Sequence, residues 1–118
     1  MSKRYNTFLN GLPDRTEKPR ANGVTMVMDK GISLRQAEDF VNTSAQFVDF
    51  IKLGFGTSVI SNNLKEKVAL YRNAGMKVYV GGTLFEAFVI RNQFNDYLKF
   101  ITELGLDCAE VSDGSIEL

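Results

Sequence analysis

The sequence predicts an α/β fold in which parallel strands alternate with helices. Four short apolar runs are separated by segments of helical periodicity, which is typical of strands joined by right-handed crossovers. An open doubly wound sheet and a segment of a (β/α)₈ barrel both fit this order. The dinucleotide-binding form of the open sheet is disfavoured, because Asp29-Lys30-Gly31 after the first strand contains only one glycine.

Residues 1–22 are expected to form an extended lead-in, with at most a short helical turn over 5–10, because they lack a sustained apolar period. Residues 23–118 then form the folded unit. Its first strand is predicted over 24–28, an apolar run suited to a strand buried on both faces. Ser33 and Gln36 are spaced as a capping box, so a helix is expected to start there. Its apolar face consists of Ala37, Phe40, Val41 and Ala45.

The later elements are predicted in the same way, at 47–53 (strand), 63–74 (helix), 76–80 (strand), 84–104 (helix) and 108–111 (strand). Gly75 and Gly105 stand where a glycine usually ends a helix. The longest helical pattern carries an apolar stripe of Leu84, Phe88, Phe94, Leu98 and Ile101.

The composition narrows the possible functions. Fourteen basic residues balance fourteen acidic ones, so neither nucleic acid nor a membrane surface is an expected partner. Residues 1–23 are polar and contain no apolar run long enough for a signal peptide or a membrane span, so a cytoplasmic location is expected. Cys108 is the only cysteine, which excludes an intrachain disulfide. Histidine is absent, which leaves oxygen ligands such as Asp and Glu for a hard metal, Mg²⁺ first.

Polar residues follow each predicted strand, at the end where both architectures place their ligands. These residues are Asp29, Lys52, Gly81-Gly82-Thr83 with Glu86, and Glu110 with Asp113. If the strand faces that carry Asp29, Lys52 and Glu110 line a barrel interior, the three side chains converge at its top. One lysine among several carboxylates suits a Mg²⁺ ion held by acids and a lysine that neutralises an anionic substrate.

Each of these residues also has a structural interpretation. Asp29 fits a turn after a strand, and Lys52 fits a lysine that reaches past apolar neighbours to solvent. Glu86 fits the third position of a capping box that begins at Thr83. Asp113-Gly114 is a common turn dipeptide.

Two further polar segments are open to interpretation. The loop over 54–58 could wrap an anion with its N–H groups, but it lacks the P-loop lysine, and tight turns explain its glycines equally well. Arg15, Lys18 and Arg20 precede the first strand, so they belong at the opposite, amino-end face. They are expected to be surface charges or oligomer contacts.

Four blocks of sequence resemble the phosphosulfolactate synthase family. They are residues 22–31 (NGVTMVMDKG), 49–58 (DFIKLGFGTS), 77–86 (KVYVGGTLFE) and 110–115 (EVSDGS). They occur in the family's order, and the resemblance covers nearly the whole chain from residue 13 onward.

The resemblance implies a (β/α)₈ (TIM) barrel lyase that adds sulfite to phosphoenolpyruvate with Mg²⁺, giving (2R)-phospho-3-sulfolactate. In methanogens this product leads towards coenzyme M. The implied catalytic residues are Lys52 and Glu86, and the implied metal ligands are Asp29, Glu110 and Asp113. The implied substrate-binding residues are Lys30, Lys52, Thr57, Ser58, Gly82 and Thr83.

A (β/α)₈ barrel needs about 250 residues, so on this resemblance the chain carries half of one. The family's lysine after the fifth strand, a proposed proton donor, lies outside it, and the chain alone is expected to be nearly inactive. Four strands leave open edges and bare inner faces. We therefore expect a homo-oligomer, a dimer first, or a complementary half-barrel, covering Val27, Val48, Phe50 and Val78. The alternative is a non-catalytic, self-associating half-barrel: an assembly module or an evolutionary or design fragment.

Overall fold

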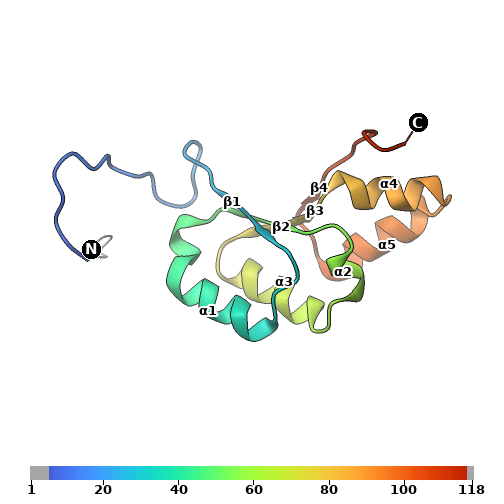
Figure 1. Ribbon diagram of the computed structural model, residues 1–118, viewed down its shortest axis with the longest axis horizontal. Helices are drawn as coiled ribbons and strands as arrows, with labels where there is room; N and C mark the ends of the chain where they lie inside the picture. Colours follow the sequence, from blue (N-terminus) through green and yellow to red (C-terminus); the bar gives the residue numbers. More distant parts are fainter. Residues whose placement is uncertain (1–5, 117–118) are drawn as a thin grey trace.

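A computed structural model describes residues 6–116 and contains a four-stranded parallel sheet (Figure 1). Its strands are β1 (Met26–Asp29), β2 (Phe50–Leu53), β3 (Lys77–Val80) and β4 (Cys108–Ala109). The order in the sheet is β1-β2-β3-β4, the order of the strands in the chain. A doubly wound sheet reverses its order at a switch point, whereas consecutive parallel strands are the arrangement of a barrel segment. The predicted α/β class is confirmed.

The helices between the strands are α1 (Leu34–Ser44), the 3₁₀ turn η1 (Ala45–Phe47), α2 (Thr57–Ile60), α3 (Leu64–Asn73), α4 (Gly82–Ile90) and α5 (Phe94–Leu104). The capping box of α1 is confirmed: the Gln36 N–H donates to the Ser33 hydroxyl, and the Ser33 N–H donates to the Gln36 side chain. Gly75 and Gly105 end α3 and α5 with positive φ angles of 88° and 70°. Both conformations favour glycine.

The predicted single helix over 84–104 is wrong, because the chain turns back between α4 and α5. Asn92 adopts a left-handed conformation with φ of 56°, which asparagine tolerates better than most residues. The turn brings aromatic rings of the two helices together, with ring centres 5.7 Å apart for Phe85 and Tyr97 and 5.5 Å for Phe88 and Tyr97. Part of the expected stripe therefore faces solvent, and Leu98 is 42% exposed.

Within residues 6–116, the helices cover one face of the sheet and leave the other face open. Figure 1 shows α1 and α3 beside β1 and β2, and α4 and α5 at the β3–β4 side. Strand residues Ile51, Leu53, Val78 and Val80 are buried in the core with side chains from α1, α3, α4 and α5. We call the other face the open sheet face; it carries Met26, Met28, Phe50, Lys52, Lys77, Tyr79 and Cys108.

The expected set of interior-facing residues is largely wrong. Of the four, Phe50 lies on the open sheet face, while Val27, Val48 and Val78 pack into the helix-covered core. For Val27 and Val78 the strand register gives the reason, since it aligns Met28 of β1 with Lys52 of β2 and Tyr79 of β3. Val48 lies before β2, directly after η1, so the alternation of β2 does not extend to it. Alternation within one strand defines two faces, but it does not say how neighbouring strands are phased.

The segment before β1 is fastened to the amino ends of the strands. Residues 6–23 contain no helix or strand; the expected helical turn is absent from 6–10, and residue 5 lies outside the described residues. Arg15 donates to the Phe47 carbonyl at 2.8 Å. Arg20 pairs with Asp49 at 2.7 Å, with side chains only 3% and 11% exposed. Arg15 and Arg20 are therefore not solvated surface charges.

Among residues 6–116, no helix has both the length and the apolar character that a membrane crossing requires.

Candidate active site

Lys52 and Glu110 meet at the carboxyl ends of the strands, as predicted. Lys52 lies on β2 and Glu110 follows β4, and the Lys52 Nζ is 2.6 Å from the Glu110 Oε1. The lysine therefore spans the width of β3. Its contact with Glu110 raises the pKa of Lys52 above its ordinary value, more than burial lowers it. Because the two side chains remain 24% and 46% exposed, an ammonium group is available here to an incoming anion.

Glu86 connects α4 to the chain that follows β4. Its carboxylate accepts a hydrogen bond from the Ser112 hydroxyl and another, 2.6 Å long, from the Ser115 N–H. These donors lower the pKa of Glu86, Ser112 having the larger effect. The alternative of a capping box begun by Thr83 is wrong, because α4 begins at Gly82 and has no side-chain cap.

Asp29 lies on the helix-covered face, opposite Lys52. The register aligns it with Leu53, so the predicted convergence of Asp29 with Lys52 and Glu110 is wrong. Its Oδ1 accepts the N–H groups of Gly31 and Ile32, at 2.8 and 3.1 Å. Its Oδ2 is 2.9 Å from both the Tyr71 hydroxyl and the Lys67 Nζ. Both carboxylate oxygens are therefore fully engaged.

We call Asp29, Lys67 and Tyr71 the Asp29 cluster. Burial raises the pKa of Asp29, but the hydrogen bonds, led by that from Lys67, outweigh it and the net pKa is lowered. Burial, and then Asp29, raise the pKa of Tyr71. Lys67 also donates to the Ile32 carbonyl at 2.7 Å, so the cluster fixes the turn after β1 to α3. This role of Lys67 was not predicted from the sequence, although Lys67 falls among the apolar residues Leu64, Val68 and Tyr71 at helical spacing on α3, which was a usable signal.

The three expected metal ligands are not brought together. Asp29 is on the far face, Glu110 contacts Lys52, and Asp113 is exposed in the segment after β4. Within residues 6–116, no group of three or more acidic or sulfur side chains is arranged to hold a cation.

The comparison with known proteins decides the family. The family model for (2R)-phospho-3-sulfolactate synthase (ComA) matches residues 13–118. The chain belongs to the phosphosulfolactate synthase family.

Three curated phosphosulfolactate synthases show how much of the family the chain represents. The protein from Methanothermobacter thermautotrophicus is 41% identical over 108 residues, which are 90% of this chain and 42% of the relative. The Bacillus subtilis protein is 33% identical over 96% of this chain and 45% of the relative. The Methanocaldococcus jannaschii protein is 39% identical over 81% and 39%. The chain thus spans less than half the length of these relatives, in agreement with half of a barrel.

The remaining expected substrate-binding residues of this phosphosulfolactate synthase family member lie near β2 and α4. Thr57 and Ser58 belong to α2, a short helix within the region predicted as a loop. The Thr57 hydroxyl donates to the Gly54 carbonyl at 2.9 Å, whereas the buried Ser58 hydroxyl has no partner among the described residues. Lys30 and Thr83 are exposed, and Gly82 is buried against Ser112.

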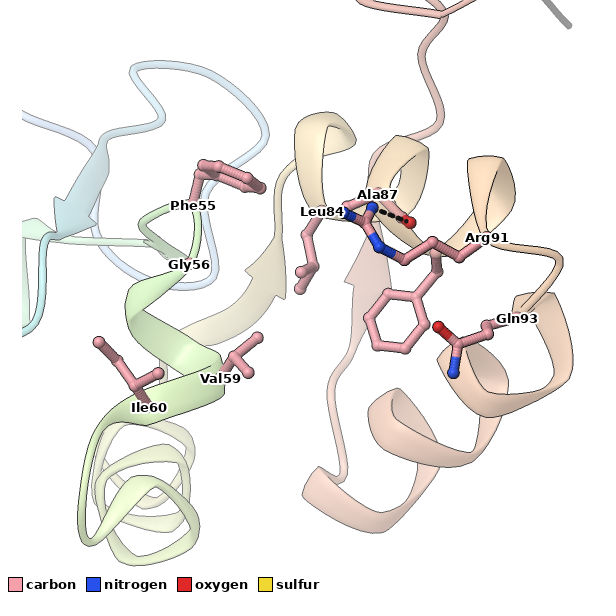
Figure 2. Close-up of a pocket in the computed structure, with 9 residues that line it drawn as sticks. Phe55, Gly56, Val59, Ile60, Leu84, Ala87, Arg91 and Gln93 are labelled. Carbon is pink, nitrogen blue, oxygen red and sulfur yellow. Dashed lines mark hydrogen bonds between the residues drawn. The ribbon is translucent and has the colours of Figure 1, made fainter.

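An apolar groove of about 400 Å³ lies between α2 and α4 (Figure 2). Its apolar lining comes from Phe55, Val59, Ile60, Leu84 and Phe88. At one end Arg91 turns back to donate to the Ala87 carbonyl at 2.9 Å. None of the residues expected to bind substrate or metal in this phosphosulfolactate synthase relative lines the groove, so we place the candidate site at Lys52 and Glu110.

Proposed function

We propose that the chain supplies the first half of a phosphosulfolactate synthase site, which adds sulfite to phosphoenolpyruvate and gives (2R)-phospho-3-sulfolactate. The observation that carries this proposal is the Lys52 ammonium, held by Glu110 at the carboxyl ends of the strands in a member of this family. Enzymes on parallel barrels place their chemistry at this end. Both substrates are anions, and an accessible cation is the group that they require.

The proposed reaction explains why a fixed cation is useful. A lone pair on the sulfite sulfur forms a bond to the terminal carbon of phosphoenolpyruvate. The electrons of the double bond move to the carbon that bears the carboxylate and phosphate, and this carbon then takes a proton. Negative charge grows on the carboxylate during the first step, so a preorganised ammonium stabilises the transition state. Lys52, kept protonated by Glu110, suits this role better than that of a base.

Glu86 fits a supporting role in this scheme. Its lowered pKa keeps it a carboxylate near neutral pH, and its two hydrogen bonds bind the Ser112–Ser115 segment to α4. We therefore assign Glu86 to positioning this segment rather than to proton donation. The proton donor would come from the other half of the barrel.

Mg²⁺ remains part of the proposal. When bound, it would neutralise the phosphate and carboxylate charges of the substrate. Glu110 and Asp113 are the predicted ligands that follow β4, and the other ligands would come from substrate or from the second half of the barrel. A cytoplasmic location likewise remains a prediction.

An assay with purified chain, phosphoenolpyruvate, sulfite and Mg²⁺ tests the proposed function. The chain alone is expected to give no detectable phosphosulfolactate by ³¹P NMR. Addition of the second half of a curated relative, expressed separately, is expected to restore turnover. A stable complex of the two halves that forms no product would contradict the proposal, and so would turnover by the chain alone.

The open sheet face favours a second candidate function, that of a self-associating half-barrel. Parallel sheets are normally covered on both faces, yet Met26 and Met28 are 46% and 43% exposed here. Beside them the rings of Phe50 and Tyr79 pack edge to face, 6.1 Å apart. We propose that a second copy, or a complementary half-barrel, covers this face.

The chain is expected to be a dimer in solution, and Met28→Lys is expected to shift it towards monomer by burying a charge in the interface. Ile60→Lys is the matched control, because Ile60 is 82% exposed but lies on α2, away from the open sheet face. Size-exclusion chromatography with light scattering measures both variants. A monomeric unaltered chain, or dissociation caused by Ile60→Lys alone, would refute dimerisation through this face.

A further inference from the structure

Gly81 lies directly after β3, beneath the Lys52 side chain, which crosses β3 to reach Glu110. A Cβ atom at Gly81 would be 2.7 Å from the Lys52 Cε and 3.3 Å from both the Lys52 Nζ and the Glu110 Oε1. The first distance is far inside a normal carbon–carbon contact of about 3.5–4.0 Å. The backbone itself gives no reason for glycine, because its φ of −79° and ψ of 169° are open to any residue. Space for the lysine is the remaining reason.

Gly82 lies beneath a different polar contact. It is buried at the start of α4, and a Cβ there would be 2.7 Å from the Ser112 Cβ and closer still to the Ser112 hydroxyl. This is the hydroxyl that donates to Glu86. Glycine has a lower helix propensity than alanine and does not have a positive φ here. Local helix formation therefore argues against glycine, and close packing of Ser112 argues for it.

We infer that Gly81 and Gly82 are positioning residues with separate tasks: Gly81 opens the path for Lys52 to reach Glu110, and Gly82 seats Ser112 against Glu86. The two glycines are adjacent in the chain. The residues after β4 that they accommodate, Glu110 beside Lys52 and Ser112 beside Glu86, are two positions apart. The contact with Glu110 holds the Lys52 ammonium over β3, and the contact with Glu86 anchors the Ser112–Ser115 segment to α4. The catalytic importance of this arrangement rests on the proposed function, but its geometry does not.

Two substitutions separate the tasks. Gly81→Ala is expected to move the Lys52 amine away from Glu110, while the contact of Ser112 with Glu86 stays unchanged. Gly82→Ala is expected to displace Ser112 from Glu86 and to leave the contact of Lys52 with Glu110 unchanged. Crystal structures of the two variants and of the unaltered chain measure both contacts as distances. Gly114→Ala is the control, because a Cβ there meets nothing within 4 Å.

Stability measurements keep the inference testable if a variant folds poorly. A Cβ at Gly81 would meet the flexible end of Lys52, so Gly81→Ala should be less favourable to stability in the unaltered chain than in a Lys52→Ala background, where the crowding atoms are gone. An equal change of stability in both backgrounds would overturn the role of Gly81. An unchanged Lys52–Glu110 distance in Gly81→Ala, or equal disturbance of both carboxylate contacts by either variant, would overturn the division of tasks. No substrate is used, so failure of the synthase proposal would leave these results standing.

Discussion

A Lys67→Met variant is expected to lose about 3–5 kcal/mol of its free energy of unfolding, because the change leaves a buried carboxylate without its cation. The side chains of Lys67 and Asp29 are each only 2% exposed, and their charged atoms are 2.9 Å apart. Methionine preserves most of the unbranched stem, so the loss reflects the charge more than a cavity. Urea denaturation followed by circular dichroism measures the difference.

Lys65→Met provides the matched control for this variant. Lys65 is on the same helix and exposed, so its replacement should change stability by no more than about 0.5 kcal/mol. Adding Asp29→Asn to Lys67→Met should recover part of the loss, since no unpaired buried charge remains. A loss below about 1 kcal/mol in Lys67→Met would show that the Asp29 cluster does not depend on its lysine.

The same cluster should make stability depend on pH in the acid range. The pKa of Asp29 is lower in the folded chain than its ordinary value, which is about 3.9 in the unfolded state. The unfolded state therefore binds more protons in this range, and stability falls as pH drops through the folded pKa. Asp49 and Glu86 act in the same direction, so the difference between the unaltered chain and Lys67→Met isolates Asp29. In the variant, the largest of the effects that lower the pKa of Asp29 is gone, so this part of the acid dependence should shrink or reverse.

Elements fixed by local chemistry could be predicted from the sequence. Ser33 and Gln36 form a cap within four residues, and Gly75 and Gly105 end their helices through their own backbone freedom. The break at Asn92 was missed because the apolar spacing continues through it, and aromatic packing between α4 and α5 decides the turn. Local patterns do not contain such tertiary contacts.

The candidate site likewise has features that could be predicted from the sequence and features that could not. Lys52 and Glu110 could be paired from the sequence because both end parallel strands on the same face. Asp29 looked equivalent, yet a one-residue difference in phase between β1 and β2 puts it among the helices. The space that Gly81 provides for Lys52 depends on the relative positions of β2, β3 and β4. It therefore could not be predicted from any single segment of the sequence.

In a barrel assembled from this chain and a complementary half, Lys52→Met is expected to lower kcat/KM for phosphosulfolactate formation by about 10²–10³-fold. This is the usual effect of removing one preorganised group that stabilises developing charge. Most of the loss should be in kcat, because the charge on the carboxylate grows in the transition state. Lys99→Met is the control, since the Lys99 side chain is 73% exposed on α5 and should leave turnover unchanged.

The pH profile distinguishes this role from that of a general base. A base must lose its proton to act, so its activity would rise with pH through its pKa. Glu110 raises the pKa of Lys52 above the ordinary lysine value, about 10.4, so the ammonium persists throughout the neutral range. The Lys52 contribution should therefore be constant from about pH 6 to 9. A contribution that grows with pH would reverse the assignment, and a Lys52→Met barrel within about threefold of full activity would exclude Lys52 from the chemistry.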